Sequence, residues 1–390
     1  MPLNFMTCGE SHGKYLAVLV EGMPSGLLVD LAAINHELWR RQQGFGRGGR
    51  QKIEKDQVEI LGGVIGGKTT GAPIGFLLTN KDFKIDKMPE LFRPRPGHAD
   101  LAGSLKYDQG IRAVLERASA RETAMRVALG GLMKLLLKEF GIEIVSHVVR
   151  IGSVSITDVG AGSPRPLQKG EETSPLLSVA EIKKRTAKSQ MNCAFPDAEE
   201  AMIQLIKETI EKRDSLGGQY EVRAAGVPIG LGSYVHWKRK LDAKIARAII
   251  GMQSVKAVEF GLGTRLGTIF GSEAHDEIFY SKEKGYYRKT DRAGGFEGGM
   301  SNGAELVVRV TMKPISTLMR PLASVNMKSK KPERAEYERS DVCVVPAGSV
   351  IGEAIVAYEI ADAFLDKFGG DSLREIRRNY EGYLEQIRRS

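Results

Sequence analysis

Cysteine is scarce in this chain of 390 residues, and its three copies, Cys8, Cys193 and Cys343, include no CxxC pair. An odd number of cysteines without that spacing argues against a disulfide framework and a structural zinc site, and it favours a reducing compartment. The first residues lack the basic and then apolar layout of a signal peptide. Because no run of about 18 apolar residues is present, we expect no membrane span and a soluble, cytoplasmic protein.

Two further features are missing, namely a low-complexity linker that would divide the chain and a predicted strand followed by GxGxxG. Predicted helices and strands instead mix along the whole length. Strands are expected at 15–20, 56–80, 142–156, 219–231, 256–270 and 304–312, and helices at 30–43, 119–139, 197–218, 239–251, 350–368 and from 371. This mixture predicts one α/β (α+β) domain over residues 1–390 that is not a Rossmann fold. The polar segment 157–196 is expected to be a surface insertion within it.

Capping signals mark the ends of several predicted helices. A polar residue before a helix, with Glu three residues later, can satisfy the first free N–H groups. Gly141 is expected to stop the helix at 119–139, because glycine readily adopts the conformation that follows a helix. The predicted N-terminal caps are Asp30, the pair Ser119 and Glu122, and the pair Asp197 and Glu200.

Acidic residues are absent from one strongly basic stretch, residues 38–53, which surrounds the glycine-rich "GFGRGGR". The chain carries 57 Lys and Arg against 48 Asp and Glu, and this net charge of +9 favours an anionic partner, whether nucleic acid, membrane or a small phosphorylated molecule. A solvated ion pair, the ordinary role of an arginine, is disfavoured here because no acid lies within the stretch. Arg117 and Arg121 would face the same way if one helix contained both. The basic residues of the stretch are Arg40, Arg41, Arg47, Arg50 and Lys52.

Histidine is also rare, with six copies. His147 in a predicted strand and His36 on a predicted helix are expected to be structural or solvated. His12 and His98 differ because each lies in a polar turn flanked by glycine, "GESHG" and "RPRPGHAD", where side chains are commonly presented to a ligand. The alternative for both is a loop histidine that is bonded only to backbone.

Glycine is abundant, with 45 copies, and it gathers in short polar loops. The loop 292–305, "RAGGFEGGMSNGAE", would let backbone N–H groups approach a flat ring or a phosphate, although a glycine-rich hairpin is an equal alternative. "KPIST" at 313–317 adds a cation and two hydroxyls. These features predict a site for a doubly anionic small molecule and a cofactor phosphate, and they leave the reaction open.

Seven segments together resemble the chorismate synthase family, in that family's order and over nearly the whole chain. They are "GESHG" at 9–13, "RRQQGFGRGGR" at 40–50, "RPGHADLAGSLKY" at 95–107, "ERASARETA" at 116–124, "RAGGFEGGMSNG" at 292–303, "KPIST" at 313–317 and "ERSDVCVVPA" at 338–347.

The resemblance implies a β-α-β sandwich, usually a homotetramer, that catalyses the last step of the shikimate pathway, toward aromatic amino acids. In that step 5-enolpyruvylshikimate 3-phosphate loses phosphate by an anti 1,4-elimination to give chorismate. The enzyme would be a carbon-oxygen lyase and a flavoprotein, dependent on reduced FMN without net redox change.

The resemblance also implies roles for individual residues. His12 would protonate the departing phosphate, His98 would stand by the flavin N1 and C2 carbonyl, and Asp341 would relay the C6 proton. The substrate or NADP would contact Ser11, Arg41, Arg47, Arg50 and Arg121. FMN would contact Arg117, Ala118, Ser119, Gln253, Ser254, Gly298, Lys313, Pro314, Ile315, Ser316, Thr317 and Arg339. This chain has Gln-Ser at 253–254, where Asn-Ala is common, and Ala118 where Ser is common.

Two alternatives stay open at this point. One is an NADPH-dependent FMN oxidoreductase, since some family members reduce their own flavin and others depend on an external flavin reductase. The other is a basic nucleic-acid-binding protein, which predicts aromatic residues among the basic ones. "RRQQGFGRGGR" contains only Phe45, and a nucleic-acid role would leave His12 and His98 without a function.

Overall fold

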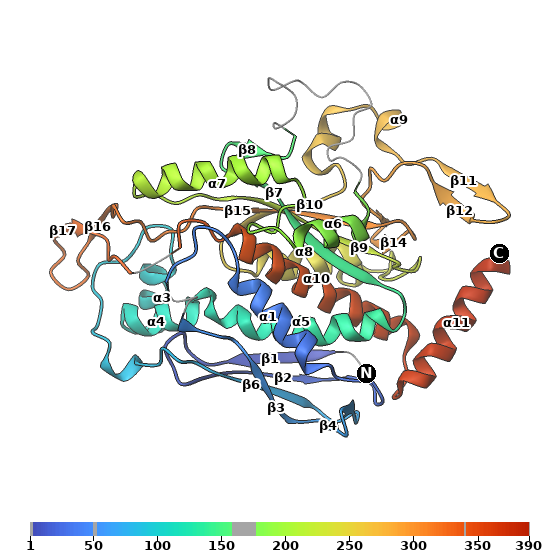
Figure 1. Cartoon of the computed structure of the whole chain (residues 1–390), viewed down its shortest axis with the longest axis horizontal. Coiled ribbons are helices and arrows are strands. Elements are labelled where there is room, and N and C mark those ends of the chain that lie inside the picture. The colour runs from blue at the N-terminus through green and yellow to red at the C-terminus, as the bar shows by residue number, and fades with distance from the viewer. Residues whose placement is uncertain (1–2, 50–52, 158–176, 339–340, 390) are drawn as a thin grey trace.

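The structure is a computed structural model, and it describes residues 3–49, 53–157, 177–338 and 341–389. Two antiparallel sheets enclose a layer of helices (Figure 1). One sheet has four strands in the order β1 (Asn4–Cys8), β2 (Tyr15–Glu21), β6 (Ile74–Thr79) and β3 (Val58–Gly62). The other has five, in the order β10 (Val255–Phe260), β15 (Leu306–Met312), β9 (Gly218–Ala225), β7 (Glu143–Ile151) and β8 (Val154–Ser155).

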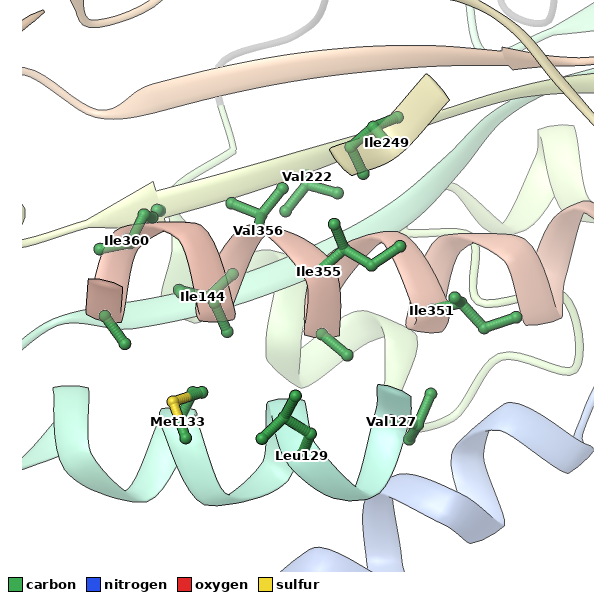
Figure 2. Packing of buried hydrophobic residues seen from close by; sticks show 14 of the residues in the cluster. Val127, Leu129, Met133, Ile144, Val222, Ile249, Ile351, Ile355, Val356 and Ile360 are labelled. Carbon is green, nitrogen blue, oxygen red and sulfur yellow. The ribbon is translucent and has the colours of Figure 1, made fainter. Parts of the chain in front are cut away.

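The middle layer is built from α1 (Leu31–Gln42), α5 (Thr123–Lys138), α8 (Leu241–Ile250) and α10 (Val345–Phe368). Figure 2 shows aliphatic side chains of α5 and α10 meeting one another and the sheet residues Ile144 and Val222. The α5 and α10 backbones approach closely at Gly130, where an added Cβ would lie 2.3 Å from the Cβ of Ala354. Glycine at this crossing therefore lets the two central helices pack tightly.

Shorter elements join and cover the layers. The helices outside the middle layer are α3 (Asp100–Tyr107), α4 (Ile111–Ala118), α6 (Val179–Thr186), α7 (Pro196–Glu211), α9 (Gly271–Ala274) and α11 (Leu373–Arg389). The short hairpins are β4 (Val64–Ile65) with β5 (Lys68–Thr69), β11 (Ile278–Ser281) with β12 (Gly285–Arg288), β13 (Phe296–Glu297) with β14 (Met300–Ser301), and β16 (Ala323–Val325) with β17 (Pro332–Arg334). The 3₁₀ turns are η1 (Ile85–Lys87), η2 (Ala120–Glu122), η3 (Trp237–Arg239) and η4 (Gly263–Thr268).

The predicted fold class is confirmed. All pairings between the labelled strands of the described chain are antiparallel, whereas a Rossmann fold needs a parallel sheet. Within β2 the residues alternate, so that Leu16, Val18 and Val20 are buried under the helices while Leu19 is exposed. Alternation of this kind is typical of a sheet with only one covered face.

Several predicted helix ends are wrong. Ser119 and Glu122 form no capping box, because Ser119 Oγ accepts from the Arg121 N–H at the start of η2 and α5 begins only at Thr123. The helix predicted from Asp197 begins at Pro196 without a side-chain cap, and it ends at Glu211 instead of near 218. Asp30 does cap α1 through the N–H of Ala33, and the conformation of Gly141 (φ +75°) follows the end of α5 as predicted.

Two predicted segments contain structure that the pattern did not indicate. The strand expected at 256–270 ends at Phe260 and is followed by η4. In the segment 157–196, residues 158–176 lie outside the described residues, while α6 begins with a complete capping box at Ser178. Val179 and Ile182 of α6 are buried against Val145 of β7.

Within the described ranges, no helix combines the length and the apolar character that crossing a membrane requires. The same part of the chain contains no group of three or more His, Cys, Asp or Glu side chains that could hold a metal ion.

Candidate active site

His12 lies in the turn between β1 and β2, beside a buried carboxylate of α4. The His12 N–H donates to Oε2 of Glu116 at 2.7 Å, and the ring Nδ1 lies 2.9 Å from Oε1. The histidine side chain is 14% exposed and that of Glu116 only 1%. The turn therefore holds the imidazole partly exposed, with its Nδ1 edge fixed by Glu116.

Glu116 is held as a carboxylate. Burial by itself raises the pKa of its carboxyl group, but hydrogen bonds from the His12 ring and backbone and the charge of Arg112 outweigh burial and lower the pKa below its ordinary value. An ionised carboxylate only accepts hydrogen bonds, so Nδ1 of His12 carries the proton of this contact. Nε2 is thereby the ring nitrogen directed away from Glu116, and it is the atom that could face a ligand.

Two hydroxyls and one amide support the same turn. The Ser11 N–H donates to the Glu116 carbonyl at 2.9 Å, and Ser119 Oγ lies 3.1 Å from Ser11 Oγ. Asn80, at the end of β6, donates from Nδ2 to the Gly13 carbonyl at 2.7 Å. The turn is thus bonded to α4, to the α4–η2 junction and to β6.

Arg41 and Arg121 lie side by side in the interior and share one acid. Arg121 Nη1 lies 2.6 Å from Oδ2 of Asp56, and Arg41 Nη1 lies 3.6 Å from the same oxygen. Burial lowers the pKa of Arg41 to about 10; the charges of Arg121 and Arg47 add to this effect and Asp56 opposes it. Glu54 also lies 3.6 Å from Nη2 of Arg121, and Asp341 pairs with Arg47, so the three guanidinium groups of this cluster lie among three carboxylates.

Two nitrogens of this arginine cluster are buried without a hydrogen-bond partner among the described residues. They are Nη1 of Arg41 and Nε of Arg47. A buried donor left unpaired costs free energy, so a bound anion that accepts from it would bind favourably.

The sequence argument that these arginines lack acidic partners is wrong in part. Asp56 and Asp341 reach the cluster from outside the basic stretch, with Asp341 Oδ2 at 3.1 Å from Nη1 of Arg47. Arg40 forms a structural network with Glu37 and with Glu353 of α10, instead of facing the cluster.

The condition under which Arg117 and Arg121 would point the same way, one helix containing both, is not met. The helix ends at Ala118, so Arg117 donates to the Thr7 and Gly9 carbonyls while Arg121 turns into the interior.

His98 forms a second histidine–carboxylate pair, with Asp100 at the start of α3. Its Nδ1 lies 2.5 Å from Oδ1 of Asp100, which is fully buried. Arg95 donates to both Asp100 oxygens, and its Nη1 donates to Thr317 Oγ1 at 2.8 Å. Burial raises the pKa of Asp100, but the contacts with His98 and Arg95 outweigh it and hold that pKa well below its ordinary range.

Glu336, Glu338 and Asp341 pair with arginines near the two histidine turns and in the arginine cluster. Glu336 pairs with Arg93 near the His98 loop at 2.6 Å, and Glu338 pairs with Arg112 beside the His12–Glu116 pair at 2.9 Å. Asp341 then accepts from the Gly48 N–H and pairs with Arg47. Three acidic residues close in sequence therefore pair with arginines at three parts of the site.

Most residues matched to flavin contacts gather near the His98 loop. Lys313 Nζ donates to the Gly97 carbonyl at 2.7 Å and to Ser316 Oγ at 2.8 Å. The Lys313 N–H donates to the Ser254 carbonyl, and Oε1 of the neighbouring Gln253 is buried without a hydrogen-bond partner in the described chain.

Other residues in that set lie apart. Gly298 is in the turn between β13 and β14, beside the N-terminus of α8, whereas Gln253 follows its C-terminus, about 15 Å away for a ten-residue helix. The loop 292–305 contains the β13–β14 hairpin, so the glycine-rich hairpin predicted as one alternative for this loop is present. The Ile315 carbonyl accepts a hydrogen bond from Ser215 Oγ, and Pro314 is exposed. Arg50 and Arg339 lie outside the described residues.

His147 is buried in β7, 3.6 Å from Glu221, and His36 stacks on Trp39 of the same helix, so both are structural as predicted.

Sequence reasoning did not single out four residues that complete the site. Only Asp100 had a local signal, since it lies two positions after His98 in a polar turn. The others contact partners far along the chain, so no spacing pattern could have revealed them. They are Glu116, Asn80, Asp56 and Asp100.

An arginine-rich interior beside a fixed imidazole, inside a β-α-β sandwich, defines an enzyme that acts on a small molecule with several negative charges. The family model described as chorismate synthase matches residues 3–365. The chain is 50% identical to the chorismate synthase of Alkaliphilus metalliredigens (97% of this chain and 99% of the relative covered) and 48% identical to that of Desulforamulus reducens (99% of both).

A solved structure titled "Crystal Structure of Chorismate Synthase" superposes with a TM-score of 0.81 at 39% identity, covering 100% of this chain and 99% of the other. The chain belongs to the chorismate synthase family. The predicted enzyme class is thereby confirmed: a lyase of the shikimate pathway whose substrate carries phosphate.

Proposed function

We propose that the arginine cluster and His12 act together on 5-enolpyruvylshikimate 3-phosphate. The observation that supports this most directly is a pair of buried guanidinium nitrogens, on Arg41 and Arg47, that have no hydrogen-bond partner among the described residues. They lie close to Arg121, which is linked to the His12 turn through Asn80. The substrate's phosphate and two carboxylates are acceptors that such donors bind well. Arg50, by the family pattern, would join them.

His12 is the proposed acid. In the elimination, the C–O bond to phosphate breaks and its electron pair leaves with the phosphate, while the electrons of the C6–H bond form the new double-bond system. A protonated His12, stabilised by the Glu116 carboxylate, would give its Nε2 proton to the leaving phosphate oxygen. Asp341 would relay the proton lost from C6, and its carboxylate is held by contacts with Arg47 and the Gly48 N–H.

The residues near His98 fit a flavin phosphate and ring. Lys313, Ser316 and the buried free acceptor of Gln253 offer a cation, a hydroxyl and an amide within one region. When bound, reduced FMN would supply electron density that assists cleavage of the C–O bond without net oxidation. His98, fixed by Asp100, would hydrogen-bond to the ring, and Arg117, Ala118 and Ser119, at the end of α4, would also contact FMN.

Assembly, location and reductant belong to the same proposal. The family pattern supports a homotetramer in the cytoplasm. Gly298, being far from Gln253 within one chain, would meet FMN only where a larger assembled site allows it. NADPH could reduce FMN on this enzyme, or an external flavin reductase could supply it. Chorismate formation in air with only NADPH and FMN added would indicate the first route, and its failure the second.

The test of the proposal uses anaerobic protein with dithionite-reduced FMN and the enolpyruvyl substrate, followed by chorismate absorbance. The native chain should turn over, whereas His12→Ala should bind FMN normally and lose most of its turnover. Normal turnover by His12→Ala would contradict the acid role. A salt-sensitive shift in the electrophoretic mobility of labelled RNA at low protein concentration would instead favour the nucleic-acid alternative.

A further inference from the structure

Asn80 occupies the space between the two parts of the proposed site. Asn80 directly follows β6 and is 1% exposed. Its backbone N–H donates to the Lys14 carbonyl at 2.9 Å. Its side chain lies between the turn that carries His12 and the guanidinium of Arg121. These two groups come from segments about a hundred residues apart, and one amide contacts both.

On one side, the Asn80 amide nitrogen holds the His12 turn. Nδ2 donates to the Gly13 carbonyl at 2.7 Å, and the carbonyls of Ser11 and Glu10 lie 3.3 and 3.4 Å from it. Ser11 and Gly13 flank His12 directly. The backbone on both sides of the imidazole is therefore tied to one buried donor.

On the other side, the Asn80 amide oxygen holds Arg121. Oδ1 accepts from Nε at 3.0 Å and from Nη2 at 2.8 Å, while the remaining nitrogen, Nη1, pairs with Asp56. A guanidinium can only donate and a carbonyl can only accept, so the orientation of the amide follows from its neighbours. Asp56 and Glu54, at 2.6 and 3.6 Å, already supply carboxylates to Arg121, and the neutral amide adds a bidentate acceptor without adding a further charge.

We propose that Asn80 is a positioning residue that sets the placement of the anion-binding Arg121 relative to the proton donor His12. This inference rests on the roles proposed above for those two residues. A residue that supplies both two donors and a bidentate acceptor is needed at position 80, and asparagine meets this need with no net charge. Misplacing a reacting group by about 1 Å can reduce turnover about a hundredfold, so such a bridge matters for rate.

Asn80→Asp and Asn80→Ala test the proposal. Aspartate keeps the acceptor for Arg121 and removes both donors to the turn, whereas alanine removes both sides without burying a charge. Thr79→Val changes the preceding, exposed residue and serves as the matched control. Each protein is assayed with dithionite-reduced FMN for kcat, for KM of the enolpyruvyl substrate and for the pH profile of kcat/KM, and its thermal midpoint is recorded.

We expect Asn80→Asp to lower kcat about thirtyfold or more and to shift the alkaline limb of the pH profile, because the His12 turn loses its donors. Asn80→Ala should also raise KM about tenfold, because Arg121 is no longer held. Thr79→Val should match the native chain. Should Asn80→Asp fail to fold, Asn80→Ala alone decides.

Folded variants with native kcat, KM and pH profile would overturn the proposal. A lower kcat in both variants, with unchanged KM and pH profile, would also overturn the proposal. That result would mean that a smaller fraction of the protein is active. A different experiment tests the role proposed for His12: normal turnover by His12→Ala would contradict that role. The Asn80 variants test only the positioning role of Asn80.

Discussion

The ring of His12 and the carboxylate of Glu116 form a fixed pair, with Nδ1 and Oε1 2.9 Å apart and the carboxylate almost completely buried. His98 and Asp100 repeat the arrangement at 2.5 Å through the same ring nitrogen. In both pairs an arginine, Arg112 or Arg95, also faces the carboxylate. Both imidazoles are therefore oriented through Nδ1, which leaves Nε2 of each directed away from its carboxylate.

Glu116→Gln should change the pH dependence of turnover. The glutamine keeps the size of the side chain but removes the charge that stabilises a protonated His12. Contact with the His12 ring lowers the pKa of Glu116, so loss of this coupled charge should move the alkaline limb of kcat/KM down by about one pH unit. The exposed Glu211→Gln is the control. A profile that stays in place would show that Glu116 does not support the proton on His12.

Glu359 on α10 should make the fold less stable at alkaline pH. Burial, helped by the charge of Asp362, raises the pKa of Glu359 to about 7. A raised folded-state value means that stability is fully present below the unfolded pKa of about 4.5 and is lost as pH rises through about 7.

Glu359→Gln should therefore stabilise the protein at pH 8, by an amount on the order of 3 kcal/mol, and have little effect at pH 4. Urea unfolding at both pH values measures this difference. An equal effect at the two pH values would contradict the ionisation argument.

Gly130→Ala should weaken the contact between the central helices. The added methyl group would lie 2.3 Å from the Ala354 Cβ and 2.5 Å from its Cα, neither of which can move without shifting α10. Overpacking of this kind should cost about 3 kcal/mol in urea unfolding at one protein concentration. Gly267→Ala, where an added Cβ meets nothing within 4 Å, should change little. Equal stability of the two variants would argue against close packing at Gly130.

The arginine cluster should bind inorganic phosphate in the absence of substrate. Phosphate would satisfy the unpartnered donors of Arg41 and Arg47 and raise the thermal midpoint, since a ligand at 100 times its Kd stabilises by about 2.7 kcal/mol. Chloride at equal ionic strength should not do so. Arg47→Ala should abolish the phosphate effect, and the exposed Arg185→Ala should retain it. Equal shifts in both variants would place phosphate elsewhere.

Much of the fold follows from local pattern. The alternation in β2 and the Asp30 cap of α1 were predictable because each depends on neighbours within a few residues. Ser119 and Glu122 show where local pattern fails. Glu122 has the spacing of a capping box, but its carboxylate bonds to Thr7 and Arg126 instead. A tertiary contact therefore replaced the capping box that the local sequence predicted.

The amino-acid sequence by itself determined the mixed helix and strand composition, the excess of arginine and the two histidine turns, since these depend on residue type and short spacing. Only the tertiary structure decided what those groups contact: Glu116 lies 104 positions from His12, and Asn80 lies 41 from Arg121. The physical reason is that buried polar atoms must find partners wherever packing places them, and packing joins residues without regard to their separation along the chain.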